Sequence, residues 1–153
     1  IELEKMNFCL KKGLCVVQGD ANYDLNDFSD NSFSTVILSQ TIQATIFPER
    51  VIKNLIRIGK RAIISFPNFG FWKIRKDFFF SGKMPKNKIL PYEWFDTPNI
   101  HLCSINDFIK LCHKNRIKIK DKVLLNENGK KIQSINFFEN LLSYQVIFCV
   151  SKK

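Results

Sequence analysis

A short buried strand that stops at a rigid turn is the feature that most restricts the fold of this chain. The apolar run Ala62-Ile63-Ile64 is followed at once by Ser65-Phe66-Pro67-Asn68. β-Branched residues favour a buried strand, and the Pro-Asn pair marks the turn that ends it. In open α/β sheets, ligands bind beyond the carboxyl ends of the strands. A functional site is therefore expected in SFPNFGFW at 65–72 and in a second loop rich in Pro, Asn and aromatic residues, LPYEWFDTPNIH at 90–101.

Strand-like and helix-like segments alternate along the chain. Apolar or alternating runs predict strands, and runs with apolar residues at helical spacing predict helices. The predicted strands are 14–17, 36–38, 61–66, 117–125 and 144–150, and the predicted helices are 6–12, 48–58, 72–80 and 104–115. This order indicates one α/β domain over residues 1–153, with a mostly parallel sheet and an antiparallel C-terminal strand.

The composition narrows the class of protein. The chain has 153 residues, of which 45% are hydrophobic, enough for one core. No apolar run reaches the roughly 18 residues of a membrane span, and the first residues do not resemble a signal peptide. The formal net charge is +10, but the lysines are scattered and form no nucleic-acid-binding motif. Only the net charge therefore favours a nucleic-acid-binding protein. Five cysteines without a CxxC pair indicate a reducing, cytoplasmic location.

Acid and amide groups lie at the ends of three predicted strands. Glu2 follows an apolar start, Asp20 follows strand 14–17, and Ser39-Gln40 follow strand 36–38. A nucleoside needs an acid for its ribose hydroxyls and an acceptor for an adenine amino group, and neighbouring strand ends can supply both. The simpler alternative stays open: Asp20 caps a turn, and Glu2 is a solvated terminal residue.

The loops and strands together resemble one known family. The run VILSQTIQA at 36–44, then RAIISFPNFGFW at 61–72, Met84-Pro85, and LPYEWFDTPNIHLCSINDF at 90–108 are similar to the MetW methionine biosynthesis proteins. The resemblance extends from residue 1 to about residue 142. It implies a Rossmann-like class I fold of the kind found in S-adenosylmethionine-dependent methyltransferases.

The resemblance also implies a cofactor and a partner. S-adenosylmethionine would place its ribose at Glu2, its adenine amino group near Asp20, and its methionine part beside Ser39 and Gln40. The protein would act as an accessory of homoserine O-acetyltransferase, with no catalytic residue and no metal. The alternative is an active methyltransferase on a small molecule, because methyl transfer needs mainly positioning of the acceptor.

This chain departs from the family pattern at three places. Ser34-Thr35 replace an Asp-Tyr pair, and Phe71 replaces a histidine, which removes a candidate for proton transfer. The family begins with a strand and a glycine-rich Asp-x-Gly-Cys-Gly loop, and the six glycines here form no such cluster. We therefore expect that this sequence is incomplete at its N-terminus, lacking the first strand and the Gly-rich loop.

Three other groups of residues suggest functions of their own. His101, Cys103, Cys112 and His113 lack the paired spacing of a structural zinc site, and Cys112 falls on the apolar face of helix 104–115. His101 lies in the 90–101 loop and is either functional or a hydrogen-bonding group of that loop. The aromatic residues form either a lid or a partner surface, and they are Phe69, Phe71, Trp72, Phe78, Phe79, Phe80, Tyr92, Trp94 and Phe95.

Overall fold

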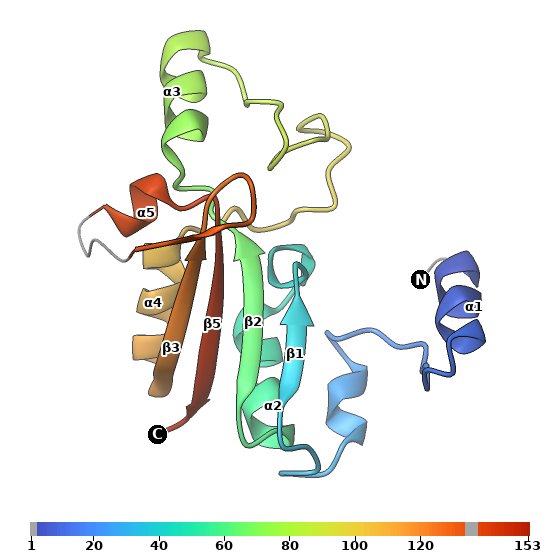
Figure 1. Ribbon diagram of the computed structural model, residues 1–153. Helices are drawn as coiled ribbons and strands as arrows, with labels where there is room; N and C mark the ends of the chain where they lie inside the picture. Colours follow the sequence, from blue (N-terminus) through green and yellow to red (C-terminus); the bar gives the residue numbers. More distant parts are fainter. Residues whose placement is uncertain (1–2, 134–137) are drawn as a thin grey trace.

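A five-stranded mixed sheet covered on one face by two helices forms the centre of the protein (Figure 1). The structure is a computed structural model that describes residues 3–133 and 138–153. The strand order is β1-β2-β5-β3-β4. The strands are β1 (Val36–Ser39), β2 (Ala62–Pro67), β3 (Ile117–Leu125), β4 (Lys131–Ile132) and β5 (Gln145–Lys152). The predicted α/β class is confirmed.

The pairing of the strands corrects one prediction. Among the described residues only β1 and β2 are parallel, while β2–β5, β5–β3 and β3–β4 are antiparallel. The sheet is therefore mixed, where the sequence predicted a mostly parallel one. The predicted antiparallel C-terminal strand is confirmed, and it enters the sheet between β2 and β3. Sequence order does not reveal such an insertion, because it depends on contacts between distant segments.

The three longest predicted helices form close to where they were expected. They are α2 (Pro48–Ile58), α3 (Trp72–Ser81) and α4 (Ile105–Lys114). Pro48 occupies the first turn of α2, where its missing N–H costs nothing. Ser104 and Asp107 form a capping box at the start of α4. The remaining helical segments are α1 (Leu3–Lys11), η1 (Asp24–Asp27), η2 (Ile42–Ala44) and α5 (Glu139–Leu142). No helix within residues 3–133 and 138–153 is both long and apolar enough to cross a bilayer.

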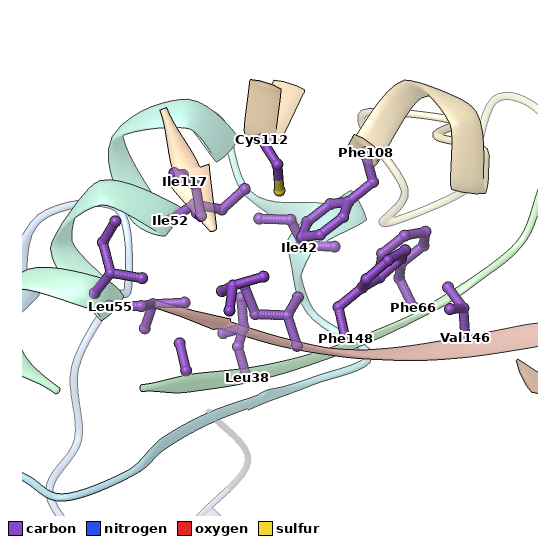
Figure 2. Close-up of a cluster of buried hydrophobic side chains, with 14 of the residues drawn as sticks. Leu38, Ile42, Ile52, Leu55, Phe66, Phe108, Cys112, Ile117, Val146 and Phe148 are labelled. Atoms are coloured by element: carbon purple, nitrogen blue, oxygen red, sulfur yellow. The ribbon is translucent and has the colours of Figure 1, made fainter. Parts of the chain in front are cut away.

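The core lies between the sheet and the pair α2 and α4. Its centre is a stack of three aromatic rings, Phe66 from β2, Phe108 from α4 and Phe148 from β5 (Figure 2). The ring centroids of Phe108 and Phe148 lie 4.7 Å apart, and those of Phe66 and Phe108 lie 5.0 Å apart. All three side chains are buried. Because β2, β5 and α4 each contribute one ring, this cluster fixes where β2 ends relative to α4.

The predicted strand 14–17 is wrong. Residues 14–20 have no regular structure, and Leu14 and Val17 are exposed. A strand needs a neighbour for its backbone groups, and the described part of the chain places none beside this segment. The apolar run Leu14-Cys15-Val16-Val17 therefore has strand-like composition without a strand to pair with.

Candidate functional site

The carboxyl ends of β1 and β2 lie side by side and bring polar groups together. Ser39 and Ser65 are register partners, and their hydroxyl oxygens lie 3.3 Å apart. The backbone N–H of Gln40 donates to the carbonyl of Ser65 at 2.9 Å and contacts the Ser65 hydroxyl at 3.2 Å. Ligands of α/β proteins bind at this edge of the sheet. The structure thus brings together two of the predicted site residues, Ser39 and Gln40.

Gln40 has an unusual backbone conformation. Its φ is +50°, in the left-handed region that residues with a side chain seldom occupy. The turn is held by Thr41, whose hydroxyl donates to the carbonyl of Ser39 at 2.7 Å, and by Gln43, whose Nε2 donates to the carbonyl of Gln40 at 2.9 Å. Strained positions of this kind concentrate at ligand-binding turns.

Gln43 is a site residue that the sequence did not predict. Its side chain is 7% exposed, and its Oε1 is buried without a hydrogen-bond partner in the described part of the chain. Its backbone carbonyl accepts from the N–H groups of Ile100 and His101, both at 2.9 Å. A buried acceptor left unpaired costs about 1–3 kcal/mol. Such an atom needs a donor from a ligand or a water molecule. The only sequence signal was its place in VILSQTIQA.

A pocket of about 310 Å³ opens beyond the ends of β1 and β2. It contains amide, phenol and proline groups and a single cation, the ammonium of Lys88. The lining residues are Gln40, Gln43, Pro67, Lys88, Ile89, Pro91, Tyr92, Pro98, Asn99, Tyr144 and Gln145. They include no carboxylate and no imidazole. The pocket can therefore bind and orient a small polar molecule, and its ionisable side chains are Lys88, Tyr92 and Tyr144.

Asp20 sits in a tight turn. Its Oδ1 accepts from the backbone N–H and the side-chain Nδ2 of Asn22, both at 2.8 Å. The Oδ1 of Asn22 in turn accepts from the N–H groups of Ile46 and Phe47, at 2.8 and 3.2 Å. Asp20 thus behaves as a turn former that holds the residues before α2, which is the simpler of the two alternatives left open by the sequence. Its part in ligand binding stays a prediction.

A chain of hydrogen bonds connects Asp20 to Gln40. From Asn22 it passes through Ile46, whose carbonyl lies 3.4 Å from Nε2 of His101. The N–H of His101 then donates to Gln43, and Gln43 donates to Gln40. His101 thus hydrogen-bonds to Ile46 and Gln43, outside the 90–101 loop, and its functional role stays a prediction. Glu2, the fourth predicted site residue, lies outside the described residues.

Asn68 is the structural centre of the SFPNFGFW loop. Its side chain is fully buried and makes four hydrogen bonds. Nδ2 donates to the carbonyls of Asn140 and Ser143, and Oδ1 accepts from the N–H groups of Gly70 and Ile105. This clamp joins the end of β2 to the start of α4 and to α5. The Pro-Asn pair was noticed in the sequence, but three of the four partners of Asn68 are 37 to 75 residues away and could not be predicted.

The cysteines and histidines show no catalytic or metal-binding arrangement. Burial raises the pKa of Cys112 to about 12, and burial together with the nearby charge of Asp107 does the same for Cys103. Both thiols are protonated at neutral pH and are poor nucleophiles. Within the described ranges no three His, Cys, Asp or Glu side chains lie close enough to hold a metal ion.

Comparisons with known proteins agree with this geometry. Residues 1–150 match the family described as methionine biosynthesis protein MetW. The chain is 32% identical over 127 residues to the bifunctional methionine biosynthesis protein MetXA/MetW of Rhodopirellula baltica. That match covers 82% of this chain and 20% of the relative, so the chain spans about a fifth of the relative's length.

Solved structures show the same fold at low sequence identity. A SAM-dependent methyltransferase from Thermotoga maritima superposes with a TM-score of 0.65 at 17% identity, over 99% of this chain and 70% of that one. A SAM-dependent methyltransferase from Archaeoglobus fulgidus gives 0.63 at 13% identity, over 99% and 73%. The fold is that of the class I methyltransferases. With the family match over residues 1–150, the chain belongs to the MetW family of methionine biosynthesis proteins.

Proposed function

We propose that this methionine biosynthesis protein binds S-adenosylmethionine at the carboxyl ends of β1 and β2 and acts as an accessory of homoserine O-acetyltransferase in the cytoplasm. The unpaired, buried Oε1 of Gln43 beside the pocket is the observation that carries the ligand-binding part. A family fold shared with SAM-dependent methyltransferases supports the choice of ligand. The relative from Rhodopirellula baltica is a bifunctional protein whose name joins MetXA and MetW, and this supports the choice of partner.

The polar groups at this edge suit part of the proposed ligand. Ser39 and Gln40 offer hydroxyl and amide groups, and Gln43 offers an acceptor that an ammonium or hydroxyl can satisfy. These three residues would hold the amino-acid end of S-adenosylmethionine. When bound, this molecule supplies an electrophilic methyl group, and its level reports the supply of methionine. The protein's own residues would bind and orient this molecule, and the pocket lining holds neither a carboxylate nor an imidazole.

Binding to the acetyltransferase and methyl transfer can be measured separately. Purified homoserine O-acetyltransferase is assayed with and without the intact protein, and complex formation is followed by pull-down. A complex together with altered acetyltransferase activity is the expected result. If neither appears, while S-adenosylmethionine is turned over above background with a small-molecule acceptor, the active-methyltransferase alternative replaces this proposal.

The ligand site has its own test. Gln43→Leu removes the unpaired acceptor, together with the Nε2 bond to the carbonyl of Gln40, while keeping a side chain of similar size. Calorimetry measures the affinity for S-adenosylmethionine and S-adenosylhomocysteine. We expect a loss of roughly ten-fold, about 1.4 kcal/mol. Gln133→Leu is the matched control, because Gln133 is exposed and does not line the pocket at β1 and β2. Equal affinities for both variants and the unchanged protein would remove Gln43 from the site.

A further inference from the structure

The end of α3 exposes three consecutive phenylalanines. Phe78, Phe79 and Phe80 are 53%, 81% and 78% exposed. Consecutive helical residues point about 100° apart, so no single face of α3 can bury all three. The rings of Phe79 and Phe80 pack edge-to-face on each other, with centroids 5.2 Å apart. An exposed cluster of large apolar side chains is typical of an interaction site.

The base of α3 is held by a second small core, so the helix is a fixed support for these rings. Ile74 is the buried residue of α3, and it packs with Phe69, Phe71, Ile89 and Leu90. In Figure 1, α3 projects beyond the carboxyl end of β2, away from α2 and α4. Gly82, with φ of +64°, ends the helix and turns the chain back toward the body. The phenylalanines are therefore presented at the tip of an anchored projection.

Positive charge surrounds the tip. A groove there is lined by Phe80 and Met84 together with Lys76, Lys83 and Lys86, and by one acid, Asp77. Lys86 pairs with Glu93 at 2.7 Å. Neither Lys76 nor Lys83 forms an ion pair in the described part of the chain, so both charges are available to a partner. The matching surface is an apolar patch flanked by carboxylates.

The groove and the ligand pocket share one segment of chain. Lys83, Met84, Pro85 and Lys86 line the groove, and Lys88, Ile89, Pro91 and Tyr92 line the pocket at β1 and β2. At the base of α3, the ring of Phe71 contacts the ring of Tyr144. Tyr144 is itself a lining residue of the pocket at β1 and β2. A partner bound at the tip would therefore contact the same segment that forms a wall of the ligand pocket. This favours a partner whose binding depends on the ligand.

We propose that the tip of α3, made of Phe78, Phe79, Phe80, Met84, Lys76 and Lys83, is the surface that binds an acid-flanked apolar patch on homoserine O-acetyltransferase. The choice of partner rests on the proposed function. The choice of surface rests on exposure, charge and continuity with the pocket. Between the two roles that the sequence left open for these aromatic residues, this assigns Phe78, Phe79 and Phe80 to a partner surface.

The test compares matched pairs of exposed apolar residues. Phe79→Ser/Phe80→Ser in the intact protein should weaken binding to purified homoserine O-acetyltransferase at least ten-fold, measured by calorimetry. Phe8→Ser/Val17→Ser changes two other exposed apolar residues and should leave the affinity unchanged. Because all four side chains are exposed, the melting temperature of both variants should stay close to that of the unchanged protein. A loss of affinity at an unchanged melting temperature then reports lost contacts with the enzyme and not unfolding.

A charge variant gives an independent reading. Lys76→Glu/Lys83→Glu should also weaken the complex, and the unchanged protein should lose affinity as salt rises, since exposed charges are screened. If the unchanged protein and both tip variants bind homoserine O-acetyltransferase with equal affinity, the tip of α3 is not the binding surface, but the enzyme remains the partner. If the unchanged protein does not bind the enzyme at all, the partnership fails and this surface assignment with it. Tip-dependent binding to anionic phospholipid vesicles, with none to the enzyme, would overturn the proposal in favour of a membrane surface.

Discussion

The side chain of Asn68 donates a hydrogen bond to the backbone carbonyl of Ser143 at 2.7 Å, across 75 positions of sequence. This bond joins the turn after β2 to the residues that precede β5. Since β2 and β5 are neighbours in the sheet, it closes the end of the sheet at which the pocket lies. A buried amide with all its groups paired holds such a junction in one arrangement.

Removal of the Asn68 side chain should therefore lower stability strongly. Asn68→Ala removes the Asn68 partner of two carbonyls and of the Gly70 N–H, whereas the Ile105 N–H keeps its bond to Oδ1 of Asn140 at 3.1 Å. We expect a loss of about 2–4 kcal/mol in the free energy of unfolding. Chemical denaturation measures it. Asn128→Ala, at an exposed turn position, is the control and should change stability by no more than about 0.5 kcal/mol. Comparable small effects at both positions would show that the clamp is not important for folding.

The backbone of Gln40 gives a second prediction. Glycine adopts a φ of +50° without steric cost, whereas a β-branched residue does not. Gln40→Val should destabilise the protein by about 1–2 kcal/mol, while Gln40→Gly should cost less than 1 kcal/mol or add slightly to stability. Thermal unfolding of the two variants side by side checks this. Equal melting temperatures would contradict a strained turn at the end of β1.

Asp20 can be tested as a ligand and as a turn former. Asp20→Ala should weaken binding of S-adenosylmethionine roughly ten-fold, consistent with about 1–2 kcal/mol for one lost hydrogen bond. Asp20→Asn keeps an oxygen that can accept from Asn22 but removes the charge, and Asn22→Ala breaks the turn but keeps the carboxylate. If only Asp20→Ala and Asn22→Ala lose affinity in calorimetry, Asp20 acts through the turn. Unchanged affinity in all three would remove it from the site.

The thiols of Cys103, which is half-buried, and Cys112, which is buried, predict a loss of stability at alkaline pH. The pKa values of Cys103 and Cys112 rise from 9.0 to about 12 on folding, so the folded state holds these protons more tightly than the unfolded state. Their contribution is complete below pH 9 and is lost as the pH rises toward 12. Each thiol removes up to about 1.4 kcal/mol per pH unit within that window. Burial raises the pKa of Tyr144 as well, which acts in the same direction.

Denaturation at pH 8 and pH 10.5 measures this effect. Cys112→Ala should be less stable than the unchanged protein at pH 8, because a buried side chain is lost, but its stability should fall less steeply with pH. Cys15→Ala is the control, since Cys15 is exposed. An identical pH slope for Cys112→Ala and the unchanged protein would contradict a buried, protonated thiol.

Local patterns in the sequence predicted much of the secondary structure. Helix α2 begins and ends at the predicted residues because Pro48 starts it and its apolar residues recur at helical spacing. Strand β3 likewise matches the predicted 117–125, where apolar and charged residues alternate. The capping box of Ser104 and Asp107 also lies within four residues. Each of these signals depends on neighbours in sequence, so the sequence was sufficient to find it.

Contacts between distant segments decided the rest. The strand predicted at 14–17 did not form because a strand depends on a partner that its own sequence does not specify. Likewise, the amide of Gln43 could have faced water, and only the packing of η2 against residues 100–101 buries it beside the pocket. The sequence by itself determined the family, the α/β class and the loops in which to look for a site. The tertiary structure alone decided which side chains meet there, because burial and hydrogen bonding across 25 to 75 positions leave no periodic trace in the chain.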